Sequence, residues 1–510
     1  MPNFIENFIN STTMYRLVLY VLTVTFIAAF ILCSFGLLPY SPLALLYSAV
    51  ILIIISWVTN ELFVRVFKAQ ANVESIFITA LILALIISPP QPGEYLSILP
   101  FLIWSGILSM ALKFILAINK KHIFNPAALA VAITALTIDQ SATWWVGTLY
   151  MLPFVIIGGY FITKKVRRFE MVIIFIVTST IVIFATSIQN YDPAQMLLTL
   201  KHIFIDSPII FFALIMFTEP LTTPSSRITR IIYAIFVGLL FAPAVHIWSI
   251  YSTPELALLA GNIIVFFMSP MRKYILTLKR SEIIAKDTGE LTFTPDHPIK
   301  FKPGQYMEWT LGQKNADNRG NRRFFTIASS PTENDILLGL KFYPESSSFK
   351  TNLAKLEEGQ TIIAGGVAGD FVLPNNKSKK LVFIAGGIGI TPFRSMIKYL
   401  LDRDEKRDIV LVYSNNSLPD LAYSEIWQAA AGKFGMKTVC TLTDTQNLPQ
   451  DWTGRIGFVS PKIIQQEIPD YHERTFYISG PHGMVTACKE MLIGMRISRY
   501  RIKTDFFPGL

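Results

Sequence analysis

The chain has 510 residues, of which 52% are hydrophobic and only 16% are charged, and its formal net charge is +10 at pH 7. A soluble protein carries about a quarter charged residues, so this composition excludes a wholly soluble chain. The positive charge does not predict nucleic-acid binding, because no basic stripe interleaved with aromatic residues accompanies it. The hydrophobic excess lies between residues 13 and about 278, and an ordinary soluble composition follows.

Cysteine usage and the N-terminus exclude further classes of protein. Cys33, Cys440 and Cys488 are scattered without Cys-x-x-Cys spacing, which excludes a disulfide framework and a cysteine-held metal or iron–sulfur centre. The opening "MPNFIENFINSTTMYR" lacks the basic region of a cleavable signal peptide, and the first apolar run is long enough to span a bilayer.

Ten apolar runs predict transmembrane segments. They cover about residues 15–36, 43–64, 74–89, 96–118, 124–138, 145–162, 171–188, 203–217, 231–250 and 254–270. Lys and Arg gather in the loops after the even-numbered segments, whereas Lys201 is the one clear cation in the opposite loops. Because cytoplasmic loops carry the Lys/Arg excess, we expect a multi-pass protein of the cell inner membrane with both termini in the cytoplasm.

The third and eighth segments are short, and both end at prolines. "IISPPQP" (86–92) ends the third on the outer side, and "MFTEPLTTPSSR" (216–227) ends the eighth on the inner side. Five segments separate them, so the two halves are inverted relative to each other. Asn125 opens the fifth segment, and Asn262 lies in the tenth. Broken segments at matching places of inverted halves predict a central binding site; alternatively, the prolines only end helices at the membrane interface.

The inner tip of the eighth segment offers polar groups that suit a flavin. Hydroxyl groups there could hold a phosphate or a ribityl chain, and Glu219 could tune the ring; alternatively, Glu219 is a proton or cation ligand, or an interfacial carboxylate beside Arg227. The candidate residues of the membrane half are Asn125, Glu219, Thr222, Thr223, Ser225 and Asn262.

The soluble part divides in two. From "FTPDHPIKFKPGQYMEWTL" (293–311) short alternating strands predict an antiparallel β-barrel, and strands alternating with helices after residue 380 predict a parallel α/β sheet. The expected domains are therefore a ten-span membrane domain at 1–280, a flavin-binding barrel at 281–376 and a nucleotide-binding domain at 377–510.

Two motifs in this part carry chemistry. In "NRRFFTIASSP" (321–331), a cation, a ring and a hydroxyl could serve a flavin. Strand alternation puts Arg323 and Phe325 on one face and Thr326 on the other, so the strand must bend or end there; an exposed edge strand is the alternative. In "GGIGITP" (386–392), a strand enters a helix through glycines, which suits a pyrophosphate, although the spacing is not that of Gly-x-Gly-x-x-Gly.

Four motifs in order make residues 285–510 resemble the ferredoxin–NADP+ reductase superfamily, in its NADH-oxidising branch: "RRFFTIASSP", "FKTNL", "GGIGITP" and "YISGPHGMV". The resemblance implies that FAD is bound by Arg323, Phe325, Thr326, Lys350 and Thr351. It implies that the pyridine nucleotide is bound by Gly386, Gly387, Gly389, Thr391, Pro392, Ser414, Asn416, Gly480, Pro481 and Met484. It places Ser479 beside the nicotinamide and Phe507, near the C-terminus, over the flavin as the catalytic residues.

Two departures from this family bear on function. Ser479 stands where the family often has a cysteine, so hydride transfer is expected to be tuned differently. Asn416 stands where relatives that select the 2′-phosphate often carry an arginine, so NADH is favoured over NADPH.

The membrane half has its own resemblance. "KHIFNPAALA", "FTEPLTTPSSR" and "LLAGNI" resemble the B subunit of sodium-translocating NADH:quinone reductase and the D subunit of the Rnf complex. Those proteins bind flavin, including FMN joined to a threonine of a Ser-x-Ala-Thr motif. "DQSAT" has Gln140 in the serine position before Thr143, so an ordinary loop threonine is favoured over covalent FMN. A second, non-covalent flavin (FMN or riboflavin) is expected in the membrane half.

The predicted protein is thus a polytopic helical membrane domain with an inverted repeat, fused to a cytoplasmic ferredoxin-reductase-like module. It is expected to take hydride from NADH onto FAD and pass electrons to a quinone or an extracytoplasmic flavoprotein. The alternatives are a redox-coupled Na+/H+ translocator and a flavin reductase on a passive anchor, and self-association into a homo-oligomer is left open. Haem is not expected, because His122, His202 and His246 are not spaced as bis-histidine ligands.

Overall fold

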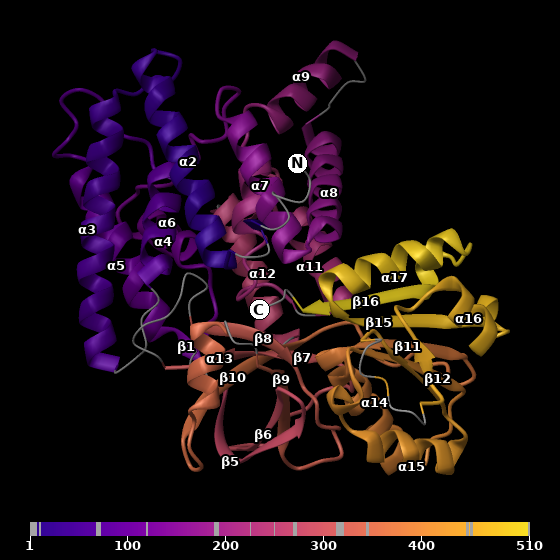
Figure 1. The fold of residues 1–510 in the computed structure, drawn as a ribbon. Helices are drawn as coiled ribbons and strands as arrows, with labels where there is room; N and C mark the ends of the chain where they lie inside the picture. The colour runs from indigo at the N-terminus through magenta and orange to yellow at the C-terminus, as the bar shows by residue number, and fades with distance from the viewer. Residues whose placement is uncertain are drawn as a thin grey trace. The chain divides into compact units, whose positions relative to one another are not determined.

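The computed structural model of the protein describes residues 8–9, 12–67, 73–118, 121–187, 193–224, 226–248, 250–268, 273–312, 321–342, 346–444, 448 and 452–507. The chain forms two compact units, Met1–Arg272 and Lys273–Leu510 (Figure 1). The first is helical, and the second contains two six-stranded sheets. The finer division of the second unit at residue 376 stays a prediction.

The first unit places helix in each of the ten predicted segments. Its helices are α2 (Met14–Ser34), α3 (Pro42–Phe67), α4 (Val73–Ile86), α5 (Leu99–Ile115), α6 (Pro126–Thr137), α7 (Leu152–Val166), α8 (Phe169–Ser187), α9 (Pro193–Phe204), α10 (Ile209–Phe211) with the π-helical η1 (Phe212–Met216), α11 (Arg227–Leu240) and α12 (Pro254–Met268). Two short hairpins join them, β1 (Ala117–Ile118) with β2 (Lys121–His122), and β3 (His246–Ile247) with β4 (Ile250–Tyr251).

The helices differ from the predicted segments in two places. The eighth segment is preceded by α9, and the two parts bend by 48° at a break between Phe204 and Ile209. The ninth ends at Leu240, because a hairpin replaces the rest of the predicted run. Apolar periodicity missed α9, since its polar residues interrupt the hydrophobic pattern.

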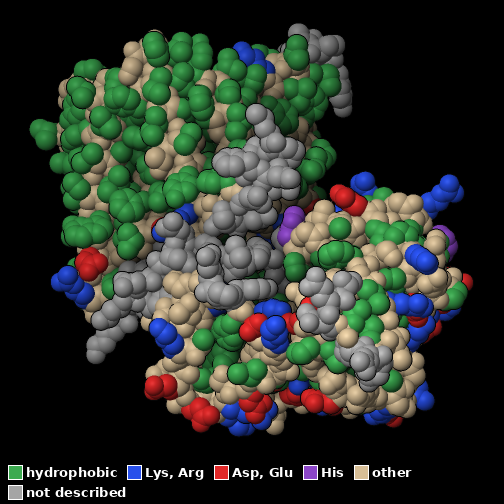
Figure 2. Space-filling view, viewed as in Figure 1, with side chains coloured by type: hydrophobic (Ala, Val, Ile, Leu, Met, Phe, Trp, Pro, Cys, Tyr) green, Lys and Arg blue, Asp and Glu red, His purple; other side chains and the backbone are tan. Residues whose placement is uncertain are grey.

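By length and composition, α2, α3 and α8 can each cross a membrane, and the bent pair would be a fourth span. The other apolar helices are shorter: α4 has 14 residues and α6 has 12, or ~21 and ~18 Å at ~1.5 Å per residue. Every residue of α4 from Thr79 to Ile86 is buried. In contrast, α2, α3 and α8 expose Ile27, Ile54, Leu62, Ile173 and Ile181, and Figure 2 shows hydrophobic side chains over most of the visible face of this unit.

Prolines mark the ends of the short helices, as predicted. The last residues of α4 and η1 are Ile86 and Met216, each a few residues before a proline, because proline lacks the N–H that would continue the ladder. Asn125 caps α6, since its Oδ1 accepts a hydrogen bond from the N–H of Ala128 at 3.1 Å and Pro126 follows as the first helical residue.

The first sheet of the second unit is antiparallel with the order β8-β7-β10-β5-β6-β9. The predicted antiparallel strands are confirmed, but they form a half-barrel in which β8 and β9 are the edges rather than a closed barrel. Its strands are β5 (Lys273–Ala285), β6 (Thr288–Pro295), β7 (Tyr306–Thr310), β8 (Arg322–Thr326), β9 (Ile336–Lys341) and β10 (Thr361–Ala368), with α13 (Ser348–Ala354) against them. Phe293, Trp309 and Phe349 are fully buried in its core.

The second sheet is parallel with the order β14-β13-β12-β11-β15-β16. The strands of this sheet and the helices that connect them are, in chain order, β11 (Leu381–Gly386), η2 (Gly387–Ile390), α14 (Thr391–Asp402), β12 (Ile409–Asn415), η3 (Leu418–Asp420), α15 (Ser424–Phe434), β13 (Lys437–Leu442), β14 (Arg455–Ile456), α16 (Pro461–Glu467), β15 (Thr475–Pro481), α17 (His482–Gly494) and β16 (Ile502–Phe507). α14 and α15 cover one face and α16 and α17 the other (Figure 1). Because the chain runs outward from β11 and returns on its other side as β15, the strand order reverses between these two strands, where open α/β sheets bind ligands.

Candidate functional site

The carboxyl ends of β11 and β15 approach so closely that only glycine fits. A Cβ on Gly389 would lie 2.4 Å from the carbonyl oxygen of Ser479 and 2.5 Å from the Cα of Gly480. A Cβ on Gly386 would lie 2.1 Å from the sulfur of Met484. By contrast, a Cβ on Gly387, at φ +50°, would meet nothing within 4 Å. The predicted nucleotide-loop residues of both strands are therefore brought together, and the turn is open at Gly387.

Ser479 lies at this point without a hydrogen-bond partner. It pairs with Ala385 across the sheet and is fully buried, and its Oγ contacts no donor or acceptor among the described residues. A buried hydroxyl without a partner costs about 1–3 kcal/mol. Such a group at the switch point of the sheet suits a bound nucleotide that would supply the missing partner.

The ends of β12 and β13 place the residues expected to select the nucleotide. Thr441 donates its hydroxyl proton to Ser414 Oγ at 3.2 Å, and Thr443 donates to Asn416 Oδ1 at 3.0 Å. Thr391 and Pro392 form the first turn of α14, after the 3-10 turn η2 that sequence reasoning did not predict. The side chain at 416 is thus a neutral amide held by its neighbour.

Arg323, Phe325 and Thr326 of the flavin motif lie on β8, and the strand ends at Thr326. Thr326 is the last residue of β8 and is buried, which meets the requirement that the strand bend or end at the motif. The Arg323 guanidinium lies 5.3 Å from the ring centroid of Phe349, and the Phe325 ring lies 5.9 Å from it. Phe349 precedes Lys350 and contacts both Arg323 and Phe325. The sequence did not predict this role for Phe349.

Four further candidates, Lys350, Thr351, Phe507 and Ser225, are placed less favourably or not at all. Lys350 donates from Nζ to the carbonyl of Lys341 at 3.1 Å, and Thr351 is exposed. The backbone of Phe507 pairs with Pro481 at the end of β16, but the side chain of Phe507 lies outside the described residues. Ser225 also lies outside them.

In the first unit, the predicted candidates of the two inverted halves meet in one hydrogen-bonded group, which we name the Glu219 cluster: Asn125, Glu219, Thr222, Asn262 and His122. Asn125 Nδ2 donates to Glu219 Oε2 at 2.9 Å, and Asn262 Oδ1 accepts from the Asn125 N–H at 2.9 Å. Thr222 donates to Glu219 Oε2 at 3.2 Å. His122 Nε2 lies 3.6 Å from Glu219 Oε1. Arg227, beside which the sequence alternative placed the Glu219 carboxylate, forms an ion pair with Glu170.

Two hydroxyl groups in the sequence segments around the cluster are buried without a partner among the described residues: Thr223 Oγ1 and Tyr233 Oη. The Tyr233 ring stacks on Phe217 at 4.9 Å between centroids with an interplanar angle of 4°. Sequence reasoning missed Tyr233, because a tyrosine in an apolar helix gives no signal distinct from packing.

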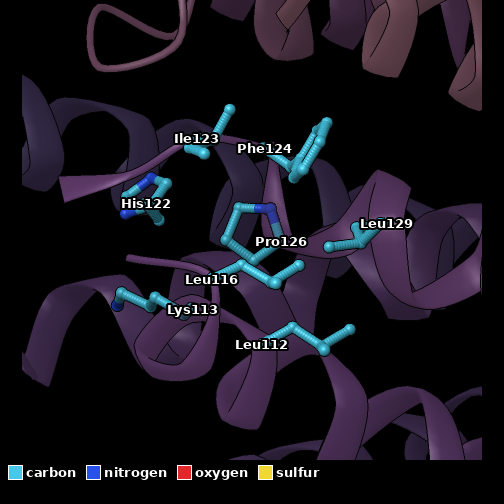
Figure 3. Close-up of a pocket in the computed structure, with 8 residues that line it drawn as sticks. All are labelled: Leu112, Lys113, Leu116, His122, Ile123, Phe124, Pro126 and Leu129. Atoms are coloured by element: carbon cyan, nitrogen blue, oxygen red, sulfur yellow. The ribbon is translucent and has the colours of Figure 1, made fainter. Parts of the chain in front are cut away.

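A pocket of about 170 Å³ adjoins the cluster through His122. Its lining residues are Leu112, Lys113, Leu116, His122, Ile123, Phe124, Pro126 and Leu129. Figure 3 shows His122 and Lys113 on one side and Phe124 and Leu129 on the other. This space includes open solvent and has no room for a water molecule, so the pocket in this structure is a shallow hollow beside His122 and not a ligand cavity.

Thr143, the weighed site for covalent FMN, is already hydrogen-bonded. Its Oγ1 lies 2.7 Å from Ser88 Oγ and donates to the Ile86 carbonyl at 3.3 Å. The neighbouring Trp144 donates from Nε1 to Glu255 at 3.1 Å. Among the described residues of the whole chain, no group of three His, Cys, Asp or Glu residues could hold a metal ion.

Comparison with known proteins concerns the second unit. Residues 383–490 match the family of oxidoreductase NAD-binding domains. A glycine betaine monooxygenase reductase subunit of Pseudomonas aeruginosa is 29% identical over 219 residues, 42% of this chain and 59% of that protein. NADH-cytochrome b5 reductase 2 of Lodderomyces elongisporus is 27% identical over 232 residues, 44% of this chain and 74% of that protein.

Among solved structures, the Amycolatopsis cytochrome P450 reductase GcoB is similar with a TM-score of 0.42 and 23% identity, over 47% of this chain and 71% of that one. The chain spans less than two thirds of the Pseudomonas aeruginosa relative.

Proposed function

We propose that the chain is a membrane NADH dehydrogenase. Its C-terminal half is a ferredoxin-reductase-like NAD(P)H oxidoreductase module that binds NAD and FAD. The chain oxidises NADH in the cytoplasm and delivers electrons through its helical half to a quinone or an extracytoplasmic flavoprotein. The observation that carries the proposal is the Ser479 hydroxyl, buried without a partner at the point where the strand order reverses.

In the module, the chain binds and orients two nucleotides. The open turn at Gly387 and the start of α14 direct backbone N–H groups to a pyrophosphate. Ser479 offers a hydrogen bond beside the nicotinamide ring, and Arg323 offers positive charge to the FAD diphosphate. When bound, FAD takes a hydride from NADH and releases its electrons singly. The neutral Asn416 favours NADH, because a 2′-phosphate would need a cation there.

The helical half is proposed to cross the membrane ten times, with the short helices buried inside the bundle. The exposed hydrophobic side chains of α2, α3 and α8 support contact with lipid. The hydrogen bond between Asn125 and Asn262 supports the inverted repeat, because these residues occupy matching places of the two halves. This arrangement also supports the resemblance to the membrane subunits of the sodium-translocating and Rnf complexes.

A second flavin, held without a covalent bond, is proposed beside the Glu219 cluster. A relay across a hydrocarbon core ~30 Å thick needs an intermediate redox centre. The unpartnered hydroxyls of Thr223 and Tyr233 fit a polar ligand. Thr223 and Tyr233 would hold polar groups of the flavin, with Glu219 and His122 placed to hold or move a proton.

The test is flavin analysis of the purified chain together with NADH titration. We expect two flavins per chain after gentle purification, one as FAD, and bleaching of both by NADH in the presence of detergent or lipid. One flavin per chain would refute the relay, and the absence of any bleaching by NADH would refute the dehydrogenase.

The buried polar cluster in a helical unit also favours a second candidate, redox-coupled translocation of Na+ or H+, because ionisable groups at membrane depth are commonly functional. NADH oxidation in proteoliposomes that accelerates with Na+ or that builds a pH gradient would support it. Rates unaffected by Na+ and by membrane potential would leave electron transfer alone. A flavin reductase on a passive anchor predicts, in addition, that the first unit can be deleted without loss of acceptor reduction.

A further inference from the structure

Polar side chains, most of them buried, connect the antiparallel sheet of the second unit to the segment that follows β12 of the parallel sheet. Tyr423 donates its phenolic proton to Glu290 Oε2 at 2.7 Å, and both residues are buried. Lys341 donates to Asp420 Oδ1 at 2.9 Å. We name these four residues the clasp: Glu290 and Lys341 from β6 and β9, and Asp420 and Tyr423 from the segment between β12 and α15.

A third link lies beside the clasp. Arg394 of α14 forms an ion pair with Glu333, and its guanidinium lies 5.7 Å from the ring centroid of Tyr423. Its Nη1 also donates to the Ala328 carbonyl at 3.2 Å. The helix that begins at the pyrophosphate turn is therefore tied to the loops of the antiparallel sheet as well.

Buried polar contacts such as these are not expected if their role is only to hold the two sheets together. Burial raises the pKa of the Glu290 carboxyl and raises that of Tyr423 well above its usual range. Burial would also raise the pKa of Asp420, but hydrogen bonds from Lys341 and Ser417 outweigh it and lower that pKa. Tyr423 also has φ +59°, a conformation that bulky side chains rarely adopt. Apolar residues would join two sheets with less desolvation, so buried polar pairs at an interface favour a role in fixing its geometry.

The clasp lies against the pyrophosphate turn at one glycine. A Cβ on Gly339 of β9 would lie 2.7 Å from Cγ2 of Thr391, 3.0 Å from Oη of Tyr423 and 3.3 Å from Cδ1 of Ile388. Ile388 belongs to η2, and Thr391 begins α14. The backbone of the flavin-binding sheet therefore touches both the clasp and the turn, and the space there has no room for a methyl group.

We propose that Gly339, Tyr423 and Glu290 are positioning residues that set the spacing between the pyrophosphate turn and the flavin-binding sheet, and with it the hydride-transfer distance. The inference rests on the proposed NADH oxidation. Hydride transfer needs the reacting atoms ~3–3.5 Å apart, and a displacement of ~1 Å far from the chemistry lowers the rate ~100-fold. Contacts of 2.7 and 3.0 Å force a displacement of several tenths of an ångström when Gly339 gains a methyl group.

The experiment is stopped-flow reduction of FAD by NADH and by [4-2H]NADH, in full-length wild type, Gly339→Ala and the matched control Gly432→Ala. Gly432 lies in α15 with nothing within 4 Å of its Cβ position. We expect Gly339→Ala to slow reduction ~10- to 100-fold, with a larger isotope effect and less than a ~3-fold change in NADH affinity, FAD content being unchanged. Gly432→Ala should match wild type.

A second pair of variants guards against misfolding. Tyr423→Phe leaves the buried Glu290 carboxylate without its donor, and it should slow hydride transfer in the same way. Adding Glu290→Gln removes the uncompensated charge and should recover most of the rate. If Gly339→Ala and Tyr423→Phe both reduce FAD at the wild-type rate, the positioning role is refuted while NADH oxidation stands. If wild type itself is not reduced by NADH, the proposed function fails and this inference fails with it.

Discussion

Replacing Gly389 with alanine tests whether the crevice between β11 and β15 binds the nucleotide. The new methyl carbon would lie 2.4 Å from the Ser479 carbonyl oxygen, 2.5 Å from Gly480 Cα and 2.6 Å from Gly480 N. All three are backbone atoms, so no side-chain rotation can relieve the contact. To reach an ordinary separation of 3.4 Å from the nearest atom, the turn must move by 3.4 − 2.4 = 1.0 Å.

A shift of that size predicts two effects of different magnitude. Overpacking costs ~1–3 kcal/mol of stability, whereas a ~1 Å displacement of the nucleotide lowers the hydride-transfer rate ~100-fold. Gly494→Ala is the matched control, because Gly494 lies at the end of α17 and its Cβ would meet nothing within 4 Å. The assay is stopped-flow FAD reduction over a range of NADH concentrations. A Gly389→Ala protein that binds NADH and reduces FAD like wild type would refute the placement of the nucleotide at this crevice.

Four further outcomes are expected. Ser479→Ala should raise the free energy of unfolding of the nucleotide-free protein by ~1 kcal/mol, since it removes an unpartnered hydroxyl, and should slow FAD reduction by NADH; lower stability would contradict this. Asn416→Arg should improve kcat/KM for NADPH relative to NADH about tenfold or more, as a charge-assisted hydrogen bond contributes ~1.5–3 kcal/mol; an unchanged ratio argues against the assignment. Glu219→Gln should lower the content of the second flavin and leave FAD reduction intact, whereas the control Glu170→Gln, whose side chain pairs with Arg227, should keep both flavins. Because burial raises the folded-state pKa of Glu290, its contribution to stability is complete below about pH 4 and is lost as pH rises through the folded pKa; thermal unfolding of wild type minus Glu290→Gln should show that sign.

Local sequence rules predicted the second unit well, and their failures have physical causes. The alternation argument required β8 to bend or end near Thr326, and the strand ends there. The glycine turn was predicted at the right residues, but not the reason for Gly389, which is the close approach of Gly480 from a strand some ninety residues later. Phe349 and Tyr423 were missed for the same reason. Their roles arise from contacts with Arg323 and Glu290 across the fold, and no local pattern encodes a partner that is distant in sequence.

In the membrane half, the symmetry between the two inverted halves predicted neighbouring residues that hydrophobic periodicity alone could not. Asn125 and Asn262 were singled out because they occupy matching places of two inverted halves, and Glu219 because it is an acid at the end of an apolar segment. Asn125 hydrogen-bonds to both of the others. Apolar environments force this outcome, because an amide or carboxylate among hydrocarbon must find a polar partner and few are available. His122 has the same need and was interpreted as an interfacial residue, although it lies three positions before Asn125 and near Glu219. A polar side chain close in sequence to a symmetry-matched one should therefore be assigned to the same cluster before it is assigned to the interface.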